Sequence, residues 1–447
     1  MLQTKLEKLV STLKEENFIP AETYKKYNVK RGLRDVHGKG VLVGLTRISE
    51  VHGYLVDEVE RVSDEGRLLY RGIDIFDIVR GFQKDGRFGF EEVAYLILFG
   101  NLPKREELEW FQRYQAEKRF LRKGFTEDYI LKNASHNIMN ALQRAILNLY
   151  VFDSEADVTT LDNVLFQSLD LIAKMPILMA YAYQAKKHHY EKRSFHLYPP
   201  KVEYSAAENL LYMMRSDGQF THKEAEILDL ALVLHAEHGG GNNSSFTNYV
   251  ISSSGTDTYS AMASSVGSLK GPLHGGANKK VLEMIAYIVE AIGENPTDGA
   301  IRDCLVSILK KEGFDKRGLI YGMGHAVYSL SDPRAILFKE KALELAEEKG
   351  VLEAYNLLHR IELISKEVFK ELKGDDFAIC ANVDFYSGFV YTMLDIPKDL
   401  FTPLFAVSRM VGWCAHRLEQ IVNDPRIIRP AYKSIYGDKQ YTSIYDR

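Results

Sequence analysis

The chain has 447 residues, of which 46% are hydrophobic and 26% are charged, and its 57 Lys and Arg against 61 Asp and Glu give a formal net charge of −4. This length predicts one large domain or two unequal ones, and the balanced charge argues against a dedicated nucleic-acid-binding protein. The cysteines Cys304, Cys380 and Cys414 are far apart and odd in number, which excludes a CxxC site and argues against a secreted disulfide framework.

The N-terminal segment is interrupted throughout by Lys and Glu, which is not typical of a signal peptide. Its apolar residues instead predict an amphipathic helix with one leucine stripe, formed by Leu2, Leu6, Leu9 and Leu13. We find no continuous apolar run near the ~20 residues that a membrane-spanning helix needs. We therefore expect a cytoplasmic protein that does not bind a membrane.

The strand-like segments are short and lie near the N-terminus, at 41–48 and 67–71. Pro103 is expected to open a helix at its first position, where the missing N–H costs nothing. Further along, apolar residues recur with the helical period over 126–151, 158–186, 221–237, 278–292, 296–312, 333–348, 351–372 and 399–423. We expect well over half of the chain to be helical, against roughly one third in an average globular protein, and so an α-rich fold.

Glycine-rich segments interrupt this helical pattern at 238–243, 271–276 and 321–325, and a further polar segment surrounds Asp384. Each of them places a titratable side chain beside the backbone of a predicted loop. Glycine lets the main chain approach a ligand closely, and loops on a rigid scaffold are where catalytic residues concentrate. These segments are therefore the candidate functional sites.

Each candidate side chain also has a simpler explanation. His235 and His238 stand three residues apart and could bind a metal together, but neither HExxH nor a third ligand accompanies them. Asp384 could cap a helix. Three arginines could be ordinary surface charges: Arg334, Arg409 and Arg429. The chain also lacks the GxSxG, GxGxxG and GxxxxGK[ST] patterns, so an acyl-transfer serine elbow and the two common phosphate-binding loops are not expected.

Taken together, the candidates fit one kind of chemistry. A carboxylate can remove a proton, neutral imidazoles can donate hydrogen bonds to a developing oxyanion, and arginines can bind carboxylates through two bonds each. This combination suits proton abstraction next to a carbonyl, followed by attack of the enolate on a dicarboxylic keto acid. The spacing of the residues alone does not select that reaction over others.

Five segments resemble the successive motifs of the citrate synthase family. They are LHAEHGGGNNSSFT (234–247), GSLKGPLHGGANKKVLEMI (267–285), YGMGHAVYSLSDPRA (321–335), NVDFYSGFVY (382–391) and AVSRMVGWCAHRLEQI (406–421). The resemblance implies an all-α fold with minor β structure near the N-terminus and two domains, a large one at 1–273 and 390–447 and a small one at 274–389. It also implies a homodimer with shared active sites, which condenses acetyl-CoA with oxaloacetate and hydrolyses citryl-CoA. Neither a metal nor a cofactor is implied.

The resemblance assigns a role to single residues. Asp384 corresponds to the general base, His274 to the donor at the thioester oxygen, and His325 to the group that polarises the oxaloacetate carbonyl. His238 is implied to hold oxaloacetate. Three arginines are implied to bind its carboxylates, the last from the neighbouring subunit: Arg334, Arg409 and Arg429. The loop implied to receive CoA comprises Arg317, Gly318, Leu319, Ile320, Tyr321, Gly322, Met323 and Gly324.

Three alternatives stay open. A 2-methylcitrate synthase would use propionyl-CoA, and one methyl group in a pocket is worth only ~1–3 kcal/mol. A non-catalytic helical interaction protein would keep the fold, but would be expected to have lost His274, His325 or Asp384. A metal-dependent hydrolase would use His235 and His238. We also expect burial to raise the pKa of Asp384, because an apolar segment precedes it.

Overall fold

The computed structural model describes residues 2–35, 40–57, 60–374, 377–423 and 426–446. The chain divides into two units, Met1–Leu45 and Thr46–Arg447. The first unit holds α1 (Leu2–Asn17), α2 (Ala21–Lys26) and the 3-10 turn η1 (Arg31–Leu33). The predicted N-terminal helix is therefore confirmed. Three leucines of its stripe are exposed, at Leu6, Leu9 and Leu13, whereas the Leu2 side chain lies outside the described ones.

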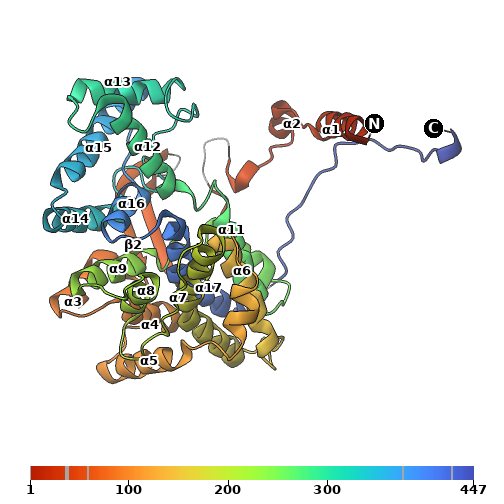
Figure 1. The fold of residues 1–447 in the computed structure, drawn as a ribbon. Helices are drawn as coiled ribbons and strands as arrows, with labels where there is room; N and C mark the ends of the chain where they lie inside the picture. Colours follow the sequence, from red (N-terminus) through yellow and green to blue (C-terminus); the bar gives the residue numbers. More distant parts are fainter. Residues whose placement is uncertain (1, 36–39, 58–59, 375–376, 424–425, 447) are drawn as a thin grey trace. The chain divides into compact units, whose positions relative to one another are not determined.

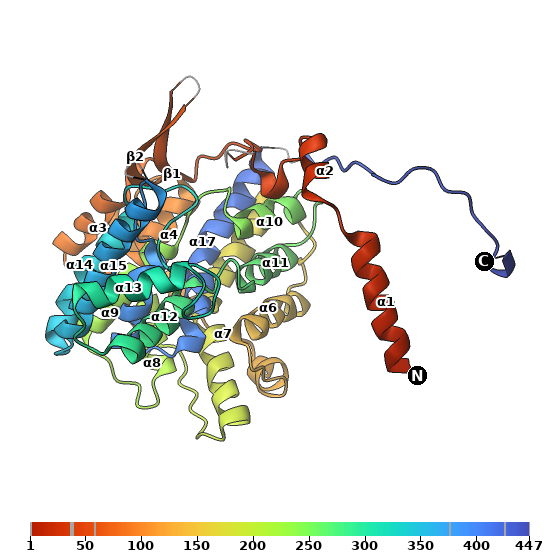
Figure 2. The same ribbon diagram turned by 90° about the horizontal axis from the view of Figure 1, so that it is seen from above.

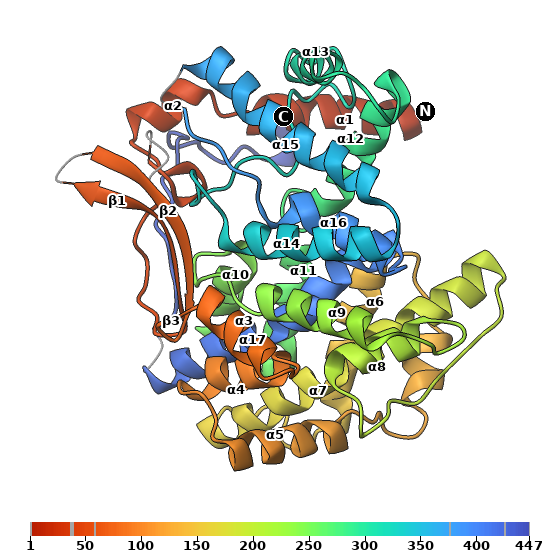
Figure 3. The same ribbon diagram turned by 90° about the vertical axis from the view of Figure 1, so that its left-hand side faces the viewer.

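The second unit begins with an antiparallel sheet in the order β1-β2-β3, with β1 at Ser49–Asp57, β2 at Glu60–Tyr70 and β3 at Ile73–Asp74. Figure 3 shows the curved β1–β2 hairpin at one side of the helices. The prediction of a strand at 67–71 is confirmed by the end of β2, but the prediction at 41–48 is wrong, since β1 begins only at Ser49. Leu42 and Leu45 are strongly exposed, so strand propensity there is not supported by packing.

Helices form 61% of the structure, which confirms the all-α class. In the second unit they are α3 (Ile75–Lys84), α4 (Phe90–Phe99), α5 (Arg105–Lys118), α6 (Ile138–Leu149), α7 (Leu161–Glu191), α8 (Ala206–Met214), α9 (His222–His235), α10 (Asn243–Ser252), α11 (Thr258–Lys270), α12 (Ala277–Ile292), α13 (Asp298–Leu309), α14 (Pro333–Glu348), α15 (Leu352–Lys373), α16 (Val383–Met393) and α17 (Phe401–Val422). Shorter elements are the π-helix η2 (Thr126–Leu131) and the 3-10 helices η3 (Tyr150–Phe152), η4 (Lys398–Leu400) and η5 (Ile444–Asp446).

Two helix predictions are wrong in detail. The segment 126–151 is not one helix, because Asn137 caps a new helix by accepting the N–H of Asn140 at 2.9 Å. Pro103 does not open α5, which begins at Arg105. The N-cap is Lys104, whose backbone N–H donates to the Glu107 carboxylate at 2.7 Å. The other predicted helices each match one observed helix within a few residues.

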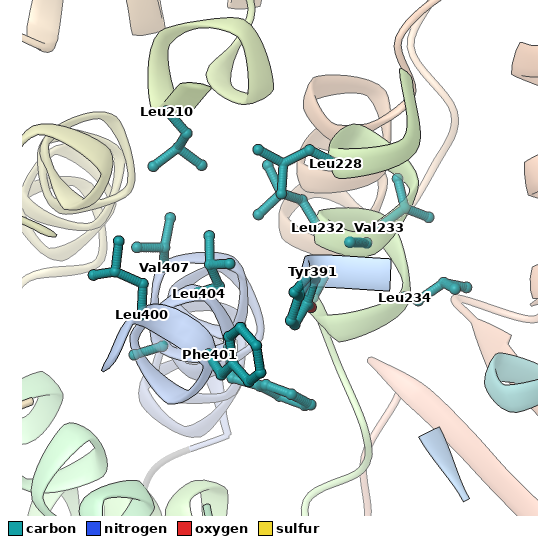
Figure 4. Packing of buried hydrophobic residues seen from close by; sticks show 14 of the residues in the cluster. Leu210, Leu228, Leu232, Val233, Leu234, Tyr391, Leu400, Phe401, Leu404 and Val407 are labelled. Atoms are coloured by element: carbon teal, nitrogen blue, oxygen red, sulfur yellow. The ribbon is translucent and has the colours of Figure 1, made fainter. Parts of the chain in front are cut away.

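The core surrounds α17, which packs against α4, α7, α9, α10 and α11 (Figures 1 and 2). Leucines of α8 and α9 face Leu404 and Val407 of α17 (Figure 4). Helix α7 is long and apolar enough by length and composition to cross a membrane, although charged residues interrupt it, and 78% of its apolar window is buried inside the protein. It is accordingly a core helix here.

Helices α12 to α16 pack on one another and lie together at one end of the view in Figure 1. They carry part of the segment expected to form the small domain, 274–389. The domain boundaries themselves stay a prediction.

Candidate active site

Six of the side chains predicted from the sequence line one cavity of about 160 Å³. It lies where five parts of the chain, remote from one another in sequence, come together. The residues that line it are His238, Asn242, Leu269, His274, Gly275, His325, Arg334, Asn382, Val383, Asp384, Phe405 and Arg409. The fold thus brings all three predicted catalytic residues into one place.

Backbone pairing joins the segment that carries His325 to the segment that carries Asp384. Asn382 donates its N–H to the Gly322 carbonyl at 2.8 Å, and its side-chain amide donates to the Gly324 carbonyl at 2.8 Å. Both glycines have positive φ, 81° and 88°, which favours glycine at these positions. The pairing fixes the two catalytic segments relative to each other.

Asp384 lies in the first turn of α16, directly after the N-cap Asn382, whose side chain accepts the Asp384 N–H at 3.0 Å. Burial raises the pKa of Asp384 to about 6, although the nearby guanidinium of Arg334 opposes the shift. The expected rise is therefore confirmed in direction. A carboxylate with this pKa is a stronger base than an exposed one and still ionised at neutral pH.

His274 lies in the turn between α11 and α12, and its Nε2 is 3.0 Å from the Oγ of Ser244. Burial and the charge of Arg409 lower the pKa of His274 to about 4, so the imidazole is neutral at physiological pH. When Ser244 donates this bond, the ring proton lies on Nδ1. The side chain is then a neutral hydrogen-bond donor, which suits an oxyanion.

His238 follows a buried ionic pair. The carboxylate of Glu237 accepts from the N–H of Gly239 at 2.5 Å, from Ser49 Oγ at 2.9 Å and from His416 Nε2 at 2.9 Å. The pair raises the pKa of His416 to about 9 and lowers that of Glu237. Burial and the charge of Arg334 hold the pKa of His238 well below its usual value. Glu237 therefore fixes the backbone that presents a neutral His238.

His325 has a defined tautomer. Its Nδ1 accepts the N–H groups of Val327 and Tyr328 at 3.1 and 3.2 Å, so a neutral ring carries its proton at Nε2. The ring stacks on Tyr328 at 4.7 Å between centroids and lies 5.1 Å from the ring of His238. Two of the three cavity histidines are thus side by side.

The two arginines of the cavity are buried and held differently. Arg334 donates from Nε and Nη2 to both carboxylate oxygens of Asp332, at 3.0 and 2.7 Å, and this pairing raises its pKa. Arg409 donates from Nε to the His235 carbonyl at 3.0 Å, and burial lowers its pKa to about 10. Among the residues that the structure describes, Arg334 has a carboxylate partner and Arg409 has none, which leaves the cavity suited to an anion.

Two predicted groups lie elsewhere. Arg429 is exposed in the extended C-terminal segment and does not line the cavity. The loop 317–324 does not line the cavity either; it ends in the paired segment of Gly322 and Gly324, and the hydroxyl of Tyr321 donates to Asp315, just before the loop, at 2.6 Å. His235 is buried against Phe405 at 3.5 Å between ring centroids, and among the described residues it shares no metal-binding group with His238.

Sequence reasoning missed several residues that shape the cavity. The polar ones are Asn242, Ser244 beside His274, and Asp332, which pairs with Arg334; the apolar ones are Leu269, Val383 and Phe405.

 Asp332 could have been found from its position, because it directly precedes the predicted helix 333–348, where Asp commonly acts as an N-cap. Asn242 also caps a helix, α10, but the sequence pattern predicts no helix at 243–252. The apolar residues carry no such signal, since they look like any other core position.

The arrangement has a clear chemical capacity. A carboxylate with a raised pKa, two neutral imidazoles and two buried guanidinium groups surround one cavity. Such a site can remove a proton next to a carbonyl, stabilise the oxyanion that forms, and bind a dicarboxylate. The fold and the cavity are therefore those of a helical protein equipped for enolate chemistry on a dicarboxylate.

Comparisons with known proteins identify the family of this chain. Residues 33–431 match the family model described as citrate synthase, C-terminal domain. The citrate synthase of Haloferax volcanii is 36% identical over 425 residues, covering 94% of this chain and 99% of that protein. A 2-methylcitrate synthase of Corynebacterium glutamicum is 32% identical over 426 residues, covering 94% and 98%.

Solved structures are similar as well. The crystal structure of citrate synthase from Pyrobaculum aerophilum has a TM-score of 0.75 and 31% identity, covering 92% of this chain and 95% of that one. The citrate synthase of Thermoplasma acidophilum, in a ternary complex with carboxymethyl coenzyme A and oxaloacetate, shares the fold with a TM-score of 0.75 at 24% identity, covering 94% and 99%. The chain belongs to the citrate synthase family, and it is an acyltransferase of that family.

Proposed function

We propose that the residues of this cavity condense acetyl-CoA with oxaloacetate and then hydrolyse citryl-CoA to citrate and CoA. One observation carries the proposal: Asp384, His274 and His325 line a single cavity together with two buried arginines. These residues come from segments that are far apart in the sequence, so the fold is what brings them together.

Oxaloacetate would bind first through its two carboxylates. Arg334 and Arg409 are the cations of the cavity, and planar guanidinium groups bind carboxylates through two charge-assisted bonds. Arg334 is already oriented by Asp332, which reduces the entropy lost on binding. His238, held by the backbone bond between Glu237 and Gly239, would donate a further hydrogen bond to the substrate.

The acetyl group would then react in two steps. The carboxylate of Asp384 takes a proton from the thioester methyl group while His274 donates a hydrogen bond to the thioester oxygen. The enol carbon attacks the ketone carbon of oxaloacetate, and the ketone oxygen receives a proton supplied at Nε2 of His325. Water then cleaves the thioester of citryl-CoA, which releases CoA and citrate.

The CoA portion would lie along the loop 317–324. This loop leads directly to the segment of His325, and Gly318, Gly322 and Gly324 have positive φ of 74°, 81° and 88°. Glycine lets the backbone of such a loop approach an adenine ring or a phosphate closely, and the N–H groups of Met323 and Gly324 already donate to the carbonyls of Ile320 and Cys380. Binding there would place the thioester close to Asp384.

The proposal includes a cytoplasmic homodimer with shared active sites. Arg429 is exposed outside the cavity of its own chain, which is consistent with an arginine that acts in the neighbouring subunit's site. Mixing a protein that carries Arg429→Ala with one that carries Asp384→Asn should then restore part of the activity that each variant lacks alone. An unchanged rate on mixing, or a monomer by sedimentation, would contradict the shared site.

No metal or organic cofactor is proposed to take part, and acetyl-CoA acts as a substrate. Oxaloacetate is proposed to bind before acetyl-CoA and to promote closure of the cavity, which would protect the enol from water. Equal affinity for acetyl-CoA with and without oxaloacetate, measured by calorimetry, would argue against that order.

A thiol-detection assay for CoA release tests the proposal. Acetyl-CoA should release CoA rapidly only when oxaloacetate is present, and more efficiently than propionyl-CoA. The second candidate, a 2-methylcitrate synthase, is favoured by the similarity to the Corynebacterium enzyme, and a higher kcat/KM for propionyl-CoA would support it. Release that does not depend on oxaloacetate would contradict both.

A further inference from the structure

The β1–β2 hairpin carries an irregularity beside the catalytic segment. His52 pairs with Arg67, but Tyr54 pairs with Ser63, so a single residue of β1 lies opposite three residues of β2. These three residues, 64–66, form a bulge, and a hydrogen-bonding contact of 2.8 Å between His52 Nε2 and Asp64 Oδ2 joins it to the facing strand. Bulges turn backbone groups out of the ladder, so that they can bond to another part of the chain.

The bulge bonds to the segment that follows His325. The N–H of Gly66 donates to Ser331 Oγ at 3.0 Å, and the Ser331 hydroxyl in turn donates to the carboxylate of Glu65. A second contact lies further along the hairpin, where the hydroxyls of Ser63 and Ser329 are 2.9 Å apart. Three residues of β2, Ser63, Glu65 and Gly66, thus bond to the segment that follows His325.

Two glycines allow the backbones to meet. A Cβ at Gly66 would lie 2.0 Å from the Ser331 carbonyl oxygen, and one at Gly53 would lie 2.7 Å from the Val327 carbonyl oxygen. Neither glycine has a positive φ, so the backbone conformation does not require glycine at either position. Glycine is needed there for space alone. By contrast, nothing lies within 4 Å of a Cβ at Gly81 in α3.

The contacted segment is short and ends in cavity residues. Tyr328 stacks on His325 at 4.7 Å and donates its N–H to the Nδ1 of that ring. Ser331 is followed directly by Asp332, which holds Arg334 through two bonds. A displacement at Val327 or Ser331 is therefore transmitted to both His325 and Arg334.

We infer that the bulged hairpin is part of the catalytic apparatus, with Gly53, Gly66 and Ser331 as positioning residues. These three residues determine the positions of the His325 and Arg334 side chains relative to Asp384. The inference rests on the proposed function, because its readout is the condensation reaction.

The test compares Gly66→Ala with the matched control Gly81→Ala, each assayed well below its own Tm. Gly66→Ala should lower kcat at least tenfold and raise the KM for oxaloacetate, while the KM for acetyl-CoA changes less than threefold. Gly81→Ala should leave all three constants unchanged. A lower Tm for Gly66→Ala with unaltered kcat and KM would overturn the inference, because the hairpin would then support only folding.

A second pair of variants covers the case in which Gly66→Ala does not fold. Ser331→Ala loses the acceptor for Gly66 and should lower kcat about fivefold, the effect of one hydrogen bond. Ser331→Thr keeps the hydroxyl and should retain the rate within twofold. Equal constants for Ser, Thr and Ala at this position would contradict the inference. A wild-type protein that releases no CoA with oxaloacetate would instead contradict the proposed function.

Discussion

Replacement of Asp384 by Asn removes one ionisable group while changing the side-chain volume little. The substitution therefore separates the chemistry of the carboxylate from its packing. A positioned general base contributes about 10²–10⁴ in rate, so kcat should fall by at least two orders of magnitude. Binding of oxaloacetate should be nearly intact, because it depends on Arg334, Arg409 and His238.

The same substitution should stabilise the fold. Burial raises the pKa of Asp384 from 3.8 to about 6, and each pKa unit corresponds to about 1.4 kcal/mol. The ionised carboxylate thus costs at most about 3 kcal/mol, and less because the side chain is only partly buried in the cavity. A raised pKa in the folded state means that this cost is full above about pH 6 and has largely disappeared at pH 4, where the folded state is protonated and the unfolded state is about half protonated.

Two assays check the expected loss of kcat and the expected gain in stability. CoA release measures kcat, and thermal or urea unfolding at pH 8 and pH 4 measures the free energy of unfolding of both proteins. Asp384→Asn should be slower and, at pH 8 only, more stable. A variant that keeps its activity within tenfold, or that is less stable than the wild type at pH 8, would refute the assignment of Asp384 as a buried base.

Three further outcomes are expected. The rate at subsaturating acetyl-CoA should fall about tenfold per pH unit below pH 6, because Asp384 is protonated there, and a pH–rate profile flat to pH 4 would contradict this. Arg409→Lys should raise the KM for oxaloacetate about 10–100-fold, since a bond to a charged group contributes about 1.5–3 kcal/mol. The exposed control Arg80→Lys should leave this KM unchanged. Equal KM values for Arg409→Lys and the wild type would show that Arg409 does not bind the substrate. Dialysis against a chelator should leave CoA release unchanged, and a loss restored by added metal would overturn the proposal of a metal-free reaction.

Much of the helical scaffold could be predicted because its apolar residues follow one period over long stretches. Helices α14 and α15, for example, lie within a residue of their predicted bounds. The predicted helix at 126–151 failed because the apolar period continues across Asn137, where a side-chain cap starts a new helix. The strand at 41–48 failed because propensity does not tell which strand has a partner to pair with.

The cavity could be predicted in part, since the motifs named six side chains that line it but not the residues that contact those side chains. Ser244 lies 30 residues from His274, and their 3.0 Å contact depends on how α10 packs against α11. The contact between Gly66 and Ser331 joins residues 265 apart and depends on a strand bulge. Neither contact leaves a local pattern in the sequence.

The most direct test of the account is the identity of the product formed from acetyl-CoA and oxaloacetate, measured by nuclear magnetic resonance or mass spectrometry alongside CoA. Citrate and CoA in equal amounts are predicted, since the cavity joins the two substrates before the thioester is cleaved. Acetate and CoA with oxaloacetate left unconsumed would contradict the account, because the protein would then be a simple thioester hydrolase.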